Sequence, residues 1–160
     1  MNFEIGNLLS PELRALMNKE KEELGRNLDT TSTIAKEWLD YFKGFFKTYY
    51  RSGSRVICNP PPLDTNDDYI LLCGDQSLRD ILETCLLFEG FRPCTADGDY
   101  SNEDFGAYRK GDLNLIVTHD KDYFDGFVKA TKLAKKLNLL KKEDRISLFK
   151  AVARNEYPEE

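Results

Sequence analysis

The sequence predicts an α+β (α/β) fold, with a mixed sheet of about four to five strands flanked by helices. Helical periodicity dominates both ends of the chain, and short apolar runs typical of strands lie between them. The 160 residues are enough for one compact domain. We therefore expect a single domain over 1–160, with N-terminal helices over 1–50, a sheet core over 51–118 and C-terminal helices over 119–155.

A pair of helices is predicted at the N-terminus. Ser10, Pro11 and Glu12 form a typical helix start, and the apolar stripe that follows ends near Gly25. The stronger helix signal runs over 31–50, where large apolar residues recur at spacings of three and four. These residues are Ile34, Trp38, Tyr41, Phe42, Phe45 and Tyr49. We expect this second helix to be the main core helix.

The strand predictions begin after Gly53. Residues 54–58 are short and β-like, and 69–73 form a continuous apolar run, as expected for a strand covered on both faces. A polar break over 74–77 then begins a helix that ends at Gly90.

The second half of the chain is predicted to contain further strands and two C-terminal helices. A strand is predicted over 91–94, and a hairpin joins 105–109 to 113–117. We expect 113–117 to lie beside the apolar strand 69–73. Two amphipathic helices complete the chain, the first of them capped by Thr118 or Asp120.

Composition narrows the class of protein. With 41% hydrophobic and 32% charged residues, the chain is expected to be soluble and globular. It has no run of about 18 apolar residues and no signal-peptide pattern, so we expect no membrane partner and a cytoplasmic location. Four cysteines match no zinc or redox motif, which predicts reduced, buried thiols. They are Cys58, Cys73, Cys85 and Cys94.

Charge is divided along the chain. Residues 64–104 contain eleven acids and two bases, whereas 129–150 contain eight bases and two acids. A metal-and-phosphate site in the acidic segment, with a basic element nearby to meet a polyanion, would use this division. The alternative is a solvated lysine face on an amphipathic helix.

Candidate site residues lie in the Gly-Ser turn at 53–54 and in the polar segment 64–68, just before the apolar strand 69–73. If 64–68 is extended, Asp64, Asn66 and Asp68 share one face. Two Mg²⁺ ions need carboxylates arranged in this way, and Asp112 is the natural third acid because its strand is expected next door. The preceding Gly-Ser turn supplies backbone amides and a hydroxyl for phosphate oxygens. The alternative is that 64–68 is an ordinary turn before a strand.

Several sequence blocks together resemble the minimal nucleotidyltransferase-like proteins of bacteriophages. The blocks lie at 53–60, 64–68, 110–118, 130–140 and 144–152, in that order. The resemblance implies the polymerase-β-like nucleotidyltransferase fold, a mixed sheet flanked by helices with a Gly-Ser turn and an Asp-x-Asp metal pair.

Carried over by position, the resemblance also implies roles for single residues. Gly53 and Ser54 would hold nucleotide phosphates, Asn66 and Asp68 occupy the Asp-x-Asp positions, and Asp112 is the third acid. This chain departs from the pattern at Asn66, where an amide replaces a carboxylate. Asn114, also an amide, occupies the more interior position on the strand of the third acid. Both changes weaken metal binding.

Two functions from different classes follow. The first is a nucleotidyltransferase that uses Mg²⁺ or Mn²⁺ and transfers a nucleoside monophosphate from an NTP to an acceptor on RNA, a protein or a small molecule. Catalytic and metal-binding roles would fall to Asp64, Asp68 and Asp112, with Asn66 as a further metal ligand. Nucleotide binding would fall to Gly53, Ser54, Arg55, Arg109 and Lys110, the bases neutralising phosphate charge.

The second function is a catalytically impaired relative of the same fold. It would act as a binding or inhibitory module toward a host protein or a nucleic acid in the host cytoplasm. The basic segment over 129–142 would suit an anionic partner, with strong salt dependence. A plain structural role is the third and least defined alternative.

Overall fold

The computed structural model describes residues 31–62, 65–94 and 104–153. Within these ranges one five-stranded sheet has the strand order β1-β2-β5-β4-β3. The elements in chain order are α2 Thr33–Phe42, η2 Lys43–Phe45, β1 Phe46–Ser52, α3 Ser54–Ile57, β2 Asp67–Cys73, α4 Gln76–Phe88, β3 Arg92–Pro93, β4 Phe105–Lys110, β5 Leu113–Thr118, α5 Lys121–Leu137 and α6 Lys142–Ala153. The helix expected after Ser10 lies outside the described residues.

The sheet is mixed, as the sequence predicts. β2 pairs in parallel with β5, and both are flanked by antiparallel neighbours, β1 beside β2 and β4 beside β5. The parallel pair confirms that 113–117 lies beside 69–73. Helices cover both faces of this sheet, so the α+β fold class is confirmed.

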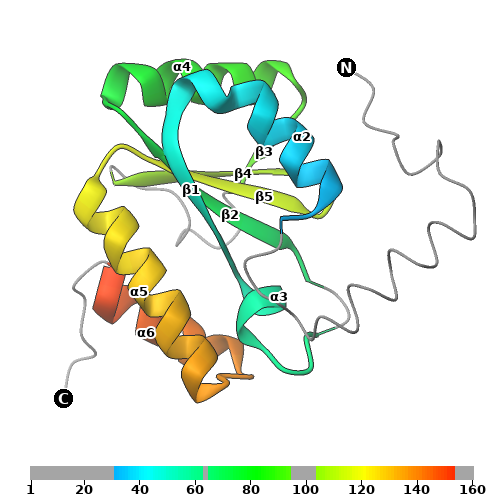
Figure 1. Ribbon diagram of the computed structural model, residues 1–160, viewed down its shortest axis with the longest axis vertical. Helices are drawn as coiled ribbons and strands as arrows, with labels where there is room; N and C mark the ends of the chain where they lie inside the picture. The colour runs from blue at the N-terminus through cyan, green and yellow to red at the C-terminus, as the bar shows by residue number, and fades with distance from the viewer. Residues whose placement is uncertain (1–30, 63–64, 95–103, 154–160) are drawn as a thin grey trace, which may run out of the picture.

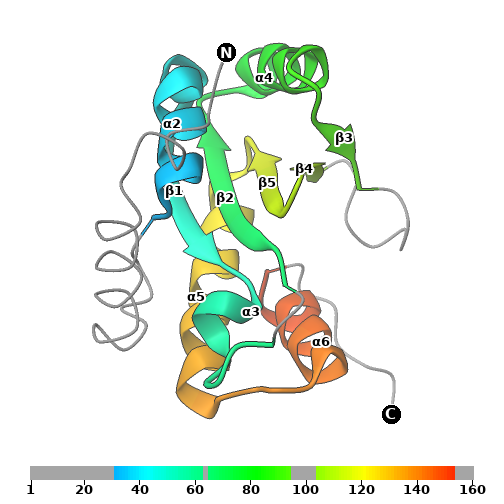
Figure 2. The ribbon, with the colours of Figure 1, turned by 90° about the vertical axis from the view of Figure 1, so that its right-hand side faces the viewer.

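The helices form two layers around the sheet. Figures 1 and 2 show α2 and α4 at one side of the sheet, with α5 and α6 at the other. Side chains alternate along β2 accordingly. Leu71 packs in the cluster under α2 and α4, whereas Ile70 packs with Phe124 of α5. The apolar run of β2 is therefore buried on both faces, as expected.

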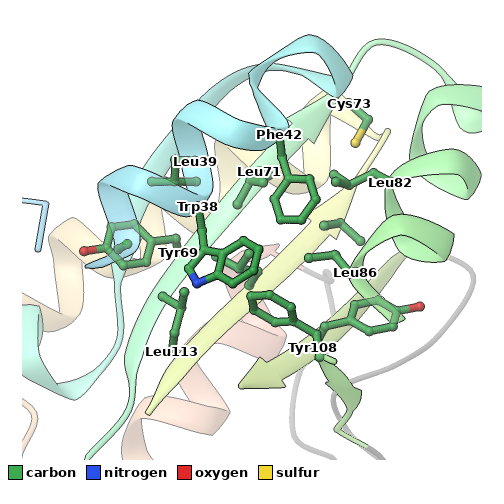
Figure 3. Close-up of a cluster of buried hydrophobic side chains, with 14 residues drawn as sticks. Trp38, Leu39, Phe42, Tyr69, Leu71, Cys73, Leu82, Leu86, Tyr108 and Leu113 are labelled. Atoms are coloured by element: carbon green, nitrogen blue, oxygen red, sulfur yellow. The ribbon is translucent and has the colours of Figure 1, made fainter. Parts of the chain in front are cut away.

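The core beneath α2 and α4 is built on aromatic rings (Figure 3). Trp38 stacks on Phe42 with ring centroids 5.7 Å apart, and it meets the ring of Phe91 edge-on at 5.1 Å. Leu71 and Leu82 complete the contact between the sheet and the two helices. Burial of these large side chains is the main stabilising contribution on this face.

The prediction of one helix over 31–50 is wrong beyond Phe42. The helix ends there, a short 3-10 turn contains Gly44, and 46–52 form the strand β1. Pairing with β2 satisfies the backbone N–H and C=O groups of this segment, and its aromatic residues favour a β-strand. Tyr49 is consequently on the sheet and 38% exposed, not part of a helical core face.

The prediction of a β-like segment over 54–58 is also wrong. Residues 54–57 form the short helix α3, because Gly53 adopts φ +80° and turns the chain. The carbonyl of Gly53 then accepts hydrogen bonds from the amides of Val56 and Ile57. This turn places Gly53 against Asp68 at the start of β2.

The second half of the chain follows the predictions closely. Asp75 caps α4 by accepting a hydrogen bond from the amide of Leu78, and Asp120 caps α5. β4 and β5 form the expected hairpin, with Gly111 at φ +60° in its turn. The four cysteines are free thiols, two buried and two half-buried. In the part of the chain that the structure describes, no helix combines the length and apolarity needed to cross a membrane.

Candidate functional site: a basic pocket against the sheet

A cavity of about 340 Å³ lies between the sheet, α3, α5 and α6. Its polar lining includes the turn after β1 and Arg109 near the end of β4, whereas its aromatic lining includes Phe105 at the start of that strand and rings from α5 and α6. The polar lining residues are Ser52, Gly53, Ser54, Thr65, Asn66, Asp68, Arg109, Asn114, Lys142, Arg145 and Lys150. The volume is at the lower end of the roughly 300–1,000 Å³ typical of small-molecule sites.

Four of the polar residues form one row across the sheet. Ser52 is the register partner of Asp68, Asp68 of Asn114, and Asn114 of Arg109. Register partners point to the same face of a sheet. Strand pairing thus collects a hydroxyl, a carboxylate, an amide and a guanidinium from four separate strands onto the floor of one pocket, which is named the polar row below.

Asp68 is held in place from two sides. The Nδ2 of Asn114 donates a hydrogen bond of 2.8 Å to Oδ1 of Asp68. On the other side the carboxylate packs directly on Gly53, where an ideal Cβ would lie only 1.9 Å from Oδ2. The thiol of Cys94 donates to Oδ1 of Asn114 at 3.6 Å, so the amide joins the thiol to the carboxylate.

Burial raises the pKa of Asp68 to about 6. The hydrogen bond from Asn114 lowers it, the neighbouring carboxylate of Asp67 raises it, and the charges of Arg109 and Arg55 lower it. Loss of hydration outweighs the stabilising partners. The carboxyl group therefore titrates just below neutral pH.

This shift predicts a pH dependence of stability. The pKa of Asp68 in the folded state, about 6, exceeds its ordinary value of 3.8. Between these values the folded protein binds more protons at this site than the unfolded chain, so its stability falls as the pH rises from about 4 to about 6. Urea unfolding across this range should show that Asp68→Asn removes this part of the decline. Equal pH slopes for the two proteins would contradict the assignment.

Five of the sequence-predicted site residues lie together on the pocket wall. They are Gly53, Ser54, Asn66, Asp68 and Arg109. Asp64 lies outside the described residues.

The other three predicted residues point elsewhere. Asp112 has a side chain 64% exposed and pairs with Arg55 at 2.9 Å. Arg55 also donates to the hydroxyl and carbonyl oxygens of Thr65. Lys110 is on the opposite face of the sheet, with Nζ 4.8 Å from the ring centroid of Trp38 and a hydrogen bond to the carbonyl of Glu89. The third-acid place beside Asp68 is filled by Asn114.

Asp67 also faces away from the pocket. Its carboxylate accepts hydrogen bonds from Ser32 Oγ at 2.8 Å, Arg51 Nε at 2.9 Å and the hydroxyl of Tyr69 at 3.0 Å. The residue is 3% exposed. These contacts tie the start of α2 to the sheet, which gives Asp67 a structural role.

Sequence reasoning missed the contribution of α6. Lys142, Arg145 and Lys150 line the pocket although the helix as a whole reads as an ordinary charged surface helix. The excess of bases over 129–150 was the available signal, but it did not show which of them face the sheet. Arg145 also fixes the chain between α5 and α6 by donating to the carbonyls of Leu139 and Leu140.

The described residues do not fit a two-metal centre. Within 31–62, 65–94 and 104–153 no three His, Cys, Asp or Glu side chains gather in a way that could hold a metal ion. Near Asp68, positions 66 and 114 hold neutral amides, and Asn114 turns its Nδ2 toward the carboxylate. Two Mg²⁺ ions need several bridging carboxylates, which amides do not replace in charge.

Fold and pocket together define a mixed α+β protein with a basic cleft beside one carboxylate. No protein-family model matches the chain, and no curated protein matches it. Among solved structures, the chain is similar to the conserved protein GrpB from Enterococcus faecalis at 12% identity and a TM-score of 0.45. The match covers 76% of this chain and 88% of that one. A likeness this distant carries no information on ligand or activity.

Proposed function

We propose that this chain is a nucleotidyltransferase-like protein that binds a nucleotide in the pocket and acts as a binding module. The observation that carries the proposal is the division of one cavity into a basic polar part and an aromatic part. A nucleotide has the same division, with phosphates at one end and a flat base at the other. A larger partner, RNA or a host protein, stays a prediction from the sequence.

The polar part suits phosphate groups. Arg109 on the floor and Lys142 at the start of α6 line the cavity from different elements, and Ser54 adds a hydroxyl. A guanidinium offers paired donors that match phosphate oxygens, and lysines add mobile positive charge. The helix α3 has only four residues, so its dipole is not part of the argument.

The aromatic part suits a base. Phe105 and Tyr123 stack with ring centroids 5.0 Å apart, and Phe127 meets Phe149 edge-on at 4.8 Å. All four rings line the cavity. Stacking on such rings is largely independent of base identity, because every base has a π-face.

Transfer of a nucleoside monophosphate, which the sequence resemblance implies, is the competing function. The contact between Gly53 and Asp68 favours it, because that contact sets a carboxylate beside the phosphate-binding turn. Incubation with each labelled NTP, RNA and either Mg²⁺ or Mn²⁺ separates the two functions. We expect binding without transfer. Transfer that disappears in Asp68→Ala would establish the enzyme instead.

Nucleotide binding itself can be tested by calorimetric titration with ATP, GTP, CTP and UTP. Arg109→Gln and Lys142→Gln should each weaken binding about tenfold or more, since hydrogen bonds to charged groups are worth roughly 1.5–3 kcal/mol. The matched control is Lys36→Gln, an exposed change on α2 across the sheet, which should leave affinity unchanged. Absence of binding by the native protein, or equal losses in all three variants, would refute the proposal.

A further inference from the structure

We propose that the pocket binds the phosphate groups of its ligand as free anions, without a bridging divalent cation. This inference rests on the proposed nucleotide binding and specifies the form in which the nucleotide is taken up. It follows from the charge of the lining, from the hydrogen bonds of the polar row, and from the position of Arg109.

The pocket wall carries an excess of positive charge. Among the lining residues that the structure describes, Asp68 is the one acid, against the bases Arg109, Lys142, Arg145 and Lys150. A pocket that takes up a metal–triphosphate complex commonly offers carboxylates to the metal. A pocket that is already positive attracts the bare triphosphate directly, and a divalent cation on the ligand reduces that attraction.

Polar atoms around Asp68 are already hydrogen-bonded within the protein. Asn114 presents its NH₂ group, not its oxygen, to Asp68, and its oxygen accepts from the thiol of Cys94. Oδ1 of Asp68 is thus occupied by an N–H donor, and the Oδ2 side packs on the backbone at Gly53. A metal ion bound here would displace the amide and leave a buried N–H without its partner, which costs free energy.

Arg109 brings a positive charge to the polar row. It is the register partner of Asn114 and so belongs to the same row as Asp68, on the far side of Asn114 from the carboxylate. A guanidinium supplies fixed positive charge together with directed donors to phosphate oxygens. The exposed acid Asp112 adds nothing to a metal site, since Arg55 holds it outside the pocket.

The test is calorimetric titration of the full-length protein with ATP, once in EDTA and once in excess Mg²⁺. We expect the Kd in EDTA to be equal to or lower than that in Mg²⁺, because the bare triphosphate carries more negative charge. Binding that requires Mg²⁺ would overturn this inference and leave nucleotide binding intact. Failure to bind in both conditions would instead refute the proposed function, so the two failures are distinguishable.

Restoring a carboxylate should reverse the preference. Asn66→Asp adds negative charge at a half-buried pocket position, and it should weaken ATP binding in EDTA about tenfold, with Mg²⁺ recovering the loss. Asn114→Asp should act in the same direction in the polar row. The matched control, Gln76→Glu on the exposed surface of α4, makes the same chemical change away from the pocket and should have no effect.

A final variant addresses the acid outside the described residues. If Asp64 supplied a metal ligand, Asp64→Asn would abolish binding in Mg²⁺ while sparing binding in EDTA. We expect it to change neither affinity more than about threefold. A selective loss in Mg²⁺ would overturn the inference.

Discussion

Asp67→Ala is expected to destabilise the protein by about 3–5 kcal/mol, the usual cost of removing one member of a buried ion pair. The side chain of Arg51 is only 16% exposed, and its Nε bonds to Asp67. Ser32 and Tyr69 donate to the same carboxylate. Alanine would remove the acceptor for all three donors at once. Urea or thermal unfolding of the two proteins measures the difference.

Two further variants make the Asp67 experiment specific. Asp40→Ala removes an exposed acid on α2 and should change stability by less than about 0.5 kcal/mol. Arg51→Met combined with Asp67→Ala should cost less than the sum of the single changes, because the two side chains interact directly and each single change already removes that interaction. A loss below about 1 kcal/mol for Asp67→Ala would contradict a structural role for this carboxylate.

Gly53→Ala is expected to be the second large effect. Its φ of +80° costs a residue with a side chain roughly 1–2 kcal/mol. In addition, the new Cβ would lie 1.9 Å from Oδ2 of Asp68, so either the turn or the carboxylate must move. We expect a loss of several kcal/mol in unfolding free energy together with a loss of nucleotide affinity.

The hairpin provides a matched control for that change. Gly111 has φ +60° but no atom within 4 Å of an ideal Cβ, so Gly111→Ala should cost only the backbone strain. Asp68→Gly removes the three atoms that would lie nearest to the new Cβ of Gly53→Ala. Gly53→Ala should therefore be much milder in the Asp68→Gly background. Equal costs in the two backgrounds would show that the clash is not the cause.

Local patterns predicted much of the fold, but not the boundary between α2 and β1. Caps such as Asp75 and Asp120, and the alternation around Gly111, are local signals, and these elements were confirmed. Trp38, Tyr41, Phe42, Phe45 and Tyr49 satisfy a helical period, yet only the first three belong to the helix. The strand forms because β2 offers hydrogen bonds to 46–52, a long-range contact that no periodicity reports.

The candidate site was likewise predicted only in part. The Gly53–Ser54 turn and Asp68 were predicted from their spacing, and they lie side by side. Asn114, and not the predicted Asp112, lies beside Asp68 because Asn114 is the register partner of Asp68. Strand register is not visible in the sequence. The contribution of α6 depends on how two helices cross, and a charge count does not contain that information.

The contact between α5 and α6 bears on how a bound ligand would affect the stability of the domain. Gly126 of α5 lies so close to α6 that an ideal Cβ would be 2.9 Å from the backbone at Val152 and Ala153. None of the twelve residues of α6 is buried, and Ile146 and Phe149 face the cavity. The helix thus rests on its neighbour along one side, and its apolar side chains toward the sheet are only partly buried. A molecule seated in the cavity would complete their burial, so it would serve as a structural component of the domain as well as its ligand.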